Sequence, residues 1–268
     1  GILNVTPDSF SGDGVSEKVT VAVQQGMAMV AAGADLLDIG GESTRPGALP
    51  VSLEEELQRV VPVVRELAHR VNTPISVDTS KPEVMVAALE AGAALINDVT
   101  ALRGSCEMSG NIQTAQMLAA RRIPTILMHM QNQPATMQQA PCYTDVVCEV
   151  YDFLAQRIDF CLQQGIARNR LLCDLGIGFG KSHDHNLALL RKRRVFRGLG
   201  VPLLLGLSRK RLIGALTGET EPNRRDVGTH LLGVLADANI LRVHDVAGAK
   251  QALAIANGLW HASLDEAA

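Results

Sequence analysis

Aromatic residues are scarce in this sequence: they make up only 3 % of its 268 positions, with one Trp, two Tyr and five Phe. A folded core must therefore be built from aliphatic side chains. Apolar residues reach 47 % and charged residues 20 %, which is ordinary for a globular protein and excludes a disordered chain. No apolar run approaches the roughly 18 residues that a membrane-spanning helix needs.

An excess of charge of one sign is also missing. The 25 Lys and Arg residues face 28 Asp and Glu residues, for a net charge of −3, so nucleic acid or an anionic membrane is not expected as the main partner. The five cysteines are irregularly spaced and form no C-x-x-C pair, which predicts reduced thiols in a cytoplasmic protein. The opening residues already have the pattern of a strand and lack that of a signal peptide, so we expect the chain to begin inside its domain.

One pattern recurs along the whole chain: a short apolar segment rich in β-branched residues ends in polar residues and is followed by a segment with helical spacing. The predicted strands are Ile2–Val5, Leu36–Ile39, Ile75–Val77, Leu95–Ile96, Thr125–Met128, Leu171–Cys173, Leu203–Gly206 and Ile240–Val243. The predicted helices are Lys18–Ala32, Leu53–Val71, Pro82–Ala91, Ile112–Arg121, Val146–Gln164, Leu187–Leu199, Arg225–Ala238 and Asp245–His261. Eight such units predict a parallel sheet buried on both faces, closed as a (β/α)8 TIM barrel in one domain over residues 1–268.

Polar residues close every predicted strand, at the end where a barrel of this kind places its active site. They are Asn4, Asp38, Asp78, Asn97, Asp98, His129, Asp174, Ser208, Arg209, Lys210, Arg242, His244 and Asp245. Carboxylates and a carboxamide can bind the edge of a polar heterocycle. A cationic set suits phosphate oxygens: Arg45, Arg209, Lys210, Arg242 and His244. No pairing of Ser with His and Asp, or of Cys with His, stands out, which argues against covalent hydrolysis.

Two motifs have a functional and a structural interpretation. The segment GIGFGKS (176–182) resembles a phosphate-binding loop, but Leu175 stands where that motif requires Gly. His183 and His185 could form a metal pair, although a solvent-exposed loop at a helix N-terminus capped by Asp184 is the favoured interpretation.

Other conspicuous residues are interpreted structurally. The basic run at 191–194 is assigned to the outer face of a helix rather than to a nucleic-acid patch, and 131–141 to a long loop. Gly33 and Gly92 suit the left-handed position that follows a helix. The methionines are assigned to the core, namely Met27, Met29, Met85 and Met117.

Eight short motifs together resemble the dihydropteroate synthase family over residues 1 to about 258. They are NVTPDSF (4–10), DIGGESTRPGA (38–48), SVDTSKP (76–82), IND (96–98), LMHMQ (127–131), GFGK (178–181), SRK (208–210) and RVHD (242–245). The resemblance implies a TIM-barrel transferase of folate biosynthesis. Such an enzyme condenses (7,8-dihydropterin-6-yl)methyl diphosphate with 4-aminobenzoate to give 7,8-dihydropteroate and diphosphate. It also implies a homodimer, Mg²⁺ as cofactor and sensitivity to sulfonamides.

Site residues follow from the same resemblance. The pterin would be held by Asp78, Asn97, Asp174 and Lys210. The diphosphate would be held by Thr44, Arg242 and His244, with Asn4 serving Mg²⁺. The 4-aminobenzoate side would comprise Phe10, Arg45, Pro46, Phe179 and Ser208. The catalytic group would be Asp78, Lys210, Arg242 and His244.

Two other functions remain open at the level of the sequence. A pterin-binding methyltransferase that uses methyltetrahydrofolate would share the acidic and amide residues of the third and fourth strands, and it would need a corrinoid partner. An inactive pterin-binding paralogue would need no diphosphate site. Retention of Lys210, Arg242 and His244 together favours the synthase.

Overall fold

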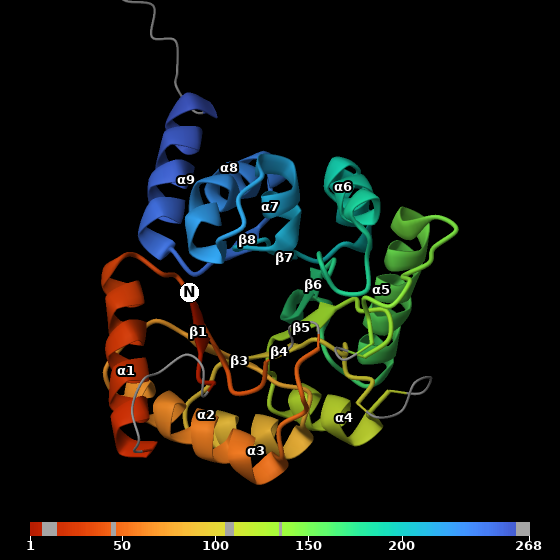
Figure 1. Cartoon of the computed structure of the whole chain (residues 1–268). Helices are drawn as coiled ribbons and strands as arrows, with labels where there is room; N and C mark the ends of the chain where they lie inside the picture. Colours follow the sequence, from red (N-terminus) through yellow and green to blue (C-terminus); the bar gives the residue numbers. More distant parts are fainter. Residues whose placement is uncertain (7–14, 44–46, 105–109, 134–135, 261–268) are drawn as a thin grey trace, which may run out of the picture.

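The computed structural model describes residues 1–6, 15–43, 47–104, 110–133 and 136–260, and these form one (β/α)8 barrel (Figure 1). Its strands are β1 (Ile2–Asn4), β2 (Leu37–Gly40), β3 (Ile75–Asp78), β4 (Leu95–Asp98), β5 (Thr125–Met128), β6 (Leu171–Asp174), β7 (Leu203–Gly206) and β8 (Ile240–Arg242). All neighbours pair in parallel and in sequence order. The predicted fold class is confirmed.

Helices follow the strands around the outside of the barrel (Figure 1). They are α1 (Val15–Ala31), α2 (Leu53–Ala68), α3 (Pro82–Glu90), α4 (Ile112–Ala120), α5 (Val146–Gln163), α6 (His183–Arg191), α7 (Arg211–Thr217), α8 (Asp226–Ala236) and α9 (Val246–Trp260). Short 3₁₀ turns are η2 (Arg168–Arg170), η3 (Arg193–Leu199) and η4 (Pro222–Arg225). The sequence missed α7, and it joined α6 and η3 into one helix although the chain breaks between them at Lys192.

Strand register brings the expected site residues to one end of the barrel. Gly40 in β2 lies opposite Asp78 in β3, and Asp78 lies opposite Asn97 in β4. The backbone N–H of Ile2 donates to the carbonyl of Val243 at 2.9 Å, which joins β1 to the end of β8. Because the strands run parallel, their carboxyl ends form a single mouth.

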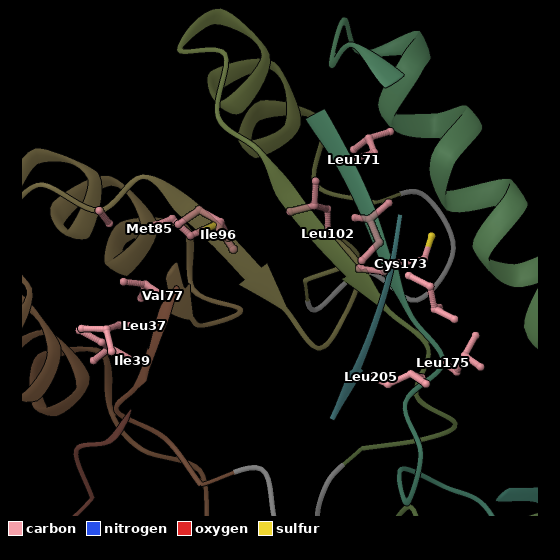
Figure 2. Close-up of a cluster of buried hydrophobic side chains, with 14 of the residues drawn as sticks. Leu37, Ile39, Val77, Met85, Ile96, Leu102, Leu171, Cys173, Leu175 and Leu205 are labelled. Carbon is pink, nitrogen blue, oxygen red and sulfur yellow. The ribbon is translucent and has the colours of Figure 1, made fainter. Parts of the chain in front are cut away.

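Aliphatic side chains fill the space between the sheet and the helices, as the lack of aromatics requires. Leu37, Ile39, Val77 and Ile96 point outward from the strands and are buried against helical residues such as Met85 (Figure 2). Each fully buried side chain of this kind contributes about 1.5–3 kcal/mol. This packing fixes the strands and so positions the mouth.

Loop 175–182 is anchored by burial and by a helix cap. Leu175 and Ile177 are fully buried in the core. Ser182 caps α6 by accepting the N–H of His185 at 3.2 Å, and the His185 ring accepts the N–H of Ser182 in return. The predicted cap, Asp184, is wrong because the helix begins one residue earlier, at His183.

Surface assignments are partly corrected. The basic run 191–194 is largely exposed, as expected. Met85 is buried in the core, but Met27 is 42 % exposed and so does not fill it, because α1 turns that position outward. None of the helices in the described parts of the chain is long and apolar enough to cross a membrane.

Two glycines at the end of the barrel opposite the mouth allow a prediction about stability. Gly165 and Gly92 have φ of +92° and +112°, which L side chains adopt only with strain. A Cβ on Gly165 would lie 3.6 Å from the Ala119 Cβ, an ordinary contact, whereas one on Gly92 would lie 2.6 Å from the Ala68 Cβ. We expect Gly165→Ala to lower the free energy of unfolding by about 1–2 kcal/mol and Gly92→Ala to lower it further.

Urea denaturation measures both effects, and ligand affinity of the folded variants should stay at the wild-type value. Equal losses for the two variants would contradict the steric part of the argument.

Candidate functional site

Arg242 lies inside the mouth between two buried carboxylates. Its Nε donates to Asp38 Oδ2, and its Nη2 donates to Asp78 Oδ2 at 2.9 Å. Asn97 Nδ2 also donates to Asp38 Oδ2, at 3.1 Å. Side chains from β2, β3, β4 and β8 therefore form one hydrogen-bonded group, which contains three residues that the sequence assigned to the ligand.

The charges of this group depend on one another. Burial raises the pKa of Asp78 to about 7, and the Asp38 carboxylate adds to the rise while Arg242 opposes it. Burial alone would raise the pKa of Asp38, but the Arg242 guanidinium, the Ser76 hydroxyl and the hydrogen bond from Asn97 hold it below its ordinary value. Burial tends to lower the pKa of Arg242, and the two carboxylates outweigh this, so Arg242 stays charged. Arg242 therefore lies between two acidic side chains of different pKa, because that of Asp38 is below its ordinary value and that of Asp78 is about 7.

A second pair, Asp174 and Lys210, lies on the β6 and β7 side of the mouth. Asp174 Oδ1 accepts the N–H of Gly176 at 2.8 Å, and burial raises its pKa, against the lowering effect of Lys210. Lys210 Nζ donates to the carbonyl of Ile177 and lies 4.6 Å from the centre of the Phe179 ring. Burial lowers the pKa of Lys210 to about 8, although Asp174 opposes the shift.

Ser208 and His244 form a pair that the sequence analysis did not foresee. Ser208 Oγ lies 2.8 Å from His244 Nδ1 and accepts the backbone N–H of His244 at 3.1 Å. This contact corrects the expectation that no Ser and His side chains pair at the strand ends. Two interactions with one residue nonetheless hold the hydroxyl in the wall of the mouth, and the reaction inferred below needs no protein nucleophile.

Arg209 does not join the cationic set. Its Nε and Nη2 bind Asp226 at 2.8 and 2.7 Å, and its Nη1 binds Asn223 at 2.8 Å. The reason is its backbone φ of +59°, which turns Arg209 toward α8 while its neighbours Ser208 and Lys210 face the mouth. Arg209 is thus a structural residue of the outer wall.

Several expected residues lie outside the described part of the chain, and their assignments stay predictions: Phe10, Thr44, Arg45 and Pro46. Asn4 ends β1 and is half-buried beside Gly40. Among the described residues no group of three or more His, Cys, Asp or Glu side chains could hold a metal ion.

The sequence analysis missed the role of Lys181. This side chain is buried, and its Nζ donates to the carbonyls of Gly176 and Phe179 at 3.0 Å and lies 2.9 Å from His129 Nδ1. Burial lowers the pKa of Lys181, and burial together with Lys181 lowers that of His129 to about 2. The only signal in the sequence was a lysine that ends a glycine-rich segment, which is also the mark of a phosphate-binding loop.

Close backbone approach explains the glycines of this loop. A Cβ on Gly176 would lie 1.8 Å from the carbonyl oxygen of His129, and one on Gly180 would lie 2.6 Å from that of Gln131. Both residues have φ of +62°. The segment is therefore a loop packed against the end of β5, which presents Phe179 to Lys210, and not a cradle for a nucleotide.

Comparison with known proteins decides the family. Residues 1–244 match the pterin binding enzyme family. The chain belongs to the dihydropteroate synthases of that family. It is 45 % identical to the dihydropteroate synthase of Escherichia coli K12 over 257 residues, which cover 95 % of this chain and 89 % of the relative.

Two solved structures of the Xanthomonas albilineans enzyme have the same fold. The complex with 4-aminobenzoic acid is similar to this chain with a TM-score of 0.90 and 48 % identity, covering 98 % of this chain and 93 % of the other. The complex with 7,8-dihydropteroate gives a TM-score of 0.87 and 46 % identity at the same coverage.

The buried His129 predicts a specific acid sensitivity. The pKa of His129 in the folded protein is about 2, far below the value of 6.5 for an exposed His. Between these two pH values the unfolded chain binds a proton on His129 and the folded protein does not. The free energy of unfolding should therefore be highest above pH 6.5 and fall below it, by about 1.4 kcal/mol per pH unit from this group.

His129→Asn removes that proton and should flatten the pH dependence by this amount between pH 6 and pH 5 in urea denaturation. The exposed His183 provides the control, since His183→Gln should leave the slope unchanged. Parallel curves for wild type and His129→Asn would refute the neutral assignment.

Proposed function

We propose that this chain condenses (7,8-dihydropterin-6-yl)methyl diphosphate with 4-aminobenzoate, which gives 7,8-dihydropteroate and diphosphate. The observation that carries the proposal is the cation Arg242 held between Asp38 and Asp78 at the mouth, beside the Asp174–Lys210 pair. At this one site a polar heterocycle can replace Arg242 as the partner of Asp78, and an anion can replace Asp78 as a partner of Arg242. Identity of 45 % to a curated synthase supports the same reaction.

Asp78, Asn97, Asp174 and Lys210 bind the pterin in this proposal. Asn97 uses its Nδ2 on Asp38, so its Oδ1 is left to accept an N–H of the ring. Asp174 has one oxygen on Gly176, which leaves the other for ring N–H and NH₂ groups. Buried acceptors of this kind reject a ligand that lacks the matching donors, because an unpaired polar group in the site costs about 1–3 kcal/mol.

The diphosphate meets Arg242, His244 and Thr44. The C–O bond to the diphosphate breaks and its electron pair leaves with the oxygen, so negative charge grows at the leaving group in the transition state. A guanidinium already in place stabilises that charge more than it stabilises the ground state. The electron-rich pterin ring delocalises the positive charge left on the exocyclic carbon, and the carboxylates of Asp78 and Asp174 stabilise it.

The second substrate completes the reaction. The amine of 4-aminobenzoate forms the new C–N bond and loses one proton, so the protein needs no covalent intermediate. Phe179 and Ser208 line this side of the mouth. Phe10, Arg45 and Pro46, which lie outside the described residues, are proposed to contact the same substrate. Ser208 precedes α7 by three residues, close enough for the helix N-terminus to favour the substrate carboxylate.

Mg²⁺ fits the mouth through Asn4. The carboxamide of Asn4 is a hard oxygen donor, is half-buried, and makes no hydrogen bond to another residue in the described part of the chain. Mg²⁺ commonly takes one or two protein ligands and completes its shell with phosphate oxygens and water. When bound, the ion would neutralise charge on the diphosphate.

A homodimer is the assembly that we infer. The outer faces of α7, α8 and α9 lie side by side (Figure 1) and carry exposed apolar side chains at helical spacing. They are Leu216, Val227, Leu231, Leu235, Ile255 and Leu259, exposed by 54 to 80 %. These six side chains, named together the apolar patch, are of the kind found at interfaces, and a second copy of the chain would cover them.

A reducing, cytoplasmic location is also proposed. Cys161 and Cys173 are buried, Cys142 and Cys148 are exposed, and all four are free. Burial raises the pKa of the Cys161 and Cys173 thiols to about 12, so both stay protonated and unreactive.

Release of diphosphate that depends on both substrates tests the reaction and separates it from methyl transfer. Asp174→Asn should weaken binding of the pterin by about 1.5–3 kcal/mol, because a charged acceptor becomes partly a donor opposite a ring N–H. Calorimetry with a pterin alcohol that lacks the diphosphate measures this loss. Unchanged affinity in the folded variant would remove Asp174 from the pterin site.

Leu231→Glu tests the interface. A charge at the centre of the apolar patch should convert the dimer to a monomer in light scattering coupled to gel filtration. Val195→Glu, at a position that is 51 % exposed on η3, is the matched control and should leave the mass unchanged. A wild-type monomer at micromolar concentration would refute the dimer.

A further inference from the structure

Asp38 has no role in the ligand-binding set, yet it holds two members of that set. One oxygen, Oδ2, accepts both Arg242 Nε and Asn97 Nδ2. The residue lies within β2 and is only 5 % exposed. A buried carboxylate that serves a cation and an amide at once suggests a role beyond packing.

We propose that Asp38 is the positioning residue of the mouth, which keeps Arg242 in place when the pterin takes Asp78 and sets the orientation of the Asn97 carboxamide. The inference rests on the ligand roles proposed above for Arg242, Asn97 and Asp78. It concerns a side chain that touches those residues and not the substrate.

Asp38 keeps Arg242 paired when a ligand binds beside it. Arg242 has two carboxylate partners, and Asp78 is one of the groups expected to receive N–H donors of the pterin. When the pterin binds Asp78, the guanidinium loses that partner inside the barrel, where an unpaired charge is costly. Asp38 then remains as its counter-ion. Because Asp38 binds through Nε, both terminal nitrogens of Arg242 are available to the diphosphate.

Asp38 also sets the orientation of the Asn97 carboxamide. An Asn side chain can turn either its NH₂ or its oxygen toward a ligand, and the two orientations have opposite hydrogen-bonding character. Since Asp38 can only accept when ionised, it fixes Nδ2 of Asn97 toward itself at 3.1 Å. The low pKa of Asp38, which Arg242 maintains, keeps it ionised. Asn97 Oδ1 therefore stays an acceptor for the pterin.

Asp38→Asn is the decisive substitution, because it keeps the shape of the side chain and removes its charge. We expect pterin-alcohol affinity to fall at least tenfold and kcat for diphosphate release to fall at least about 100-fold. The KM for 4-aminobenzoate should change less than about threefold, since none of the contacts of Asp38 lies on that side.

Two double-mutant cycles separate positioning from a general structural effect. Asp38→Asn should have less than about a threefold further effect on pterin-alcohol affinity in the Asn97→Ala background. It should have equally little further effect on kcat in the Arg242→Ala background. Losses of the same size in the wild-type and variant backgrounds would overturn the proposal, as would full activity of Asp38→Asn.

Gly165→Ala is the matched control. It lies at the opposite end of the barrel and should lower the melting temperature while leaving affinity and kcat at wild-type values. If the ligand roles proposed for Asn97 and Arg242 are wrong, the single variants Asn97→Ala and Arg242→Ala will themselves retain wild-type affinity and kcat. That result distinguishes a wrong ligand role from a wrong role for Asp38. If Asp38→Asn does not fold, Asp38→Glu, which keeps the charge and shifts its position, should fold and show the same two coupled losses.

Discussion

The guanidinium of Arg242 between the carboxylates of Asp38 and Asp78 is the interaction on which the mouth of this barrel depends. It joins β8 to β2 and β3 across the interior of the barrel. Backbone hydrogen bonds, by contrast, connect β8 only to its neighbours in the sheet, β7 and β1. Removing one partner of such a buried pair leaves an uncompensated charge, which typically costs about 3–5 kcal/mol. The chain therefore keeps a full positive charge at a place that ligands can reach.

This arrangement also explains why one site suits two unlike chemical groups. In the ligand-free protein Asp78 and Arg242, which are proposed to bind the pterin and the diphosphate, are hydrogen-bonded to each other, so neither is left unpaired in the barrel. A substrate that carries ring N–H donors at one end and an anion at the other can replace both halves of that pair together. A ligand with only the anionic group would leave Asp78 without a partner, and one with only the ring donors would leave Arg242 with Asp38 as its single partner, which disfavours binding of either relative to the complete substrate.

Local patterns in the sequence predict most of the fold and the outline of the site, because both depend on short-range spacing. The alternation of apolar strands and helices specifies the barrel, and a barrel brings strand ends such as Asp78, Asn97 and Asp174 together without further information. Contacts between distant residues were not predictable. Asp38 and Arg242 are 204 positions apart, and nothing in the sequence says that they pair rather than bind ligand separately. The direction of a single side chain was equally hidden, since the φ of +59° that turns Arg209 away follows from tertiary packing.

The β6–α6 loop illustrates how much a motif leaves open. Its glycines and its terminal lysine are the residue types that would cradle a phosphate, yet here they serve the protein's own backbone. Gly176 and Gly180 allow the loop to contact the end of β5, and Lys181 fills the space between them by donating to its carbonyls. Because its Nζ donates to those acceptors, Lys181 is not available to an anion, which agrees with the proposal that Arg242 at the end of β8 binds the diphosphate. The same loop carries Phe179, whose ring contacts Lys210 and whose carbonyl accepts a hydrogen bond from Lys181. Lys181 therefore also helps to hold the part of the mouth where the second substrate is proposed to bind.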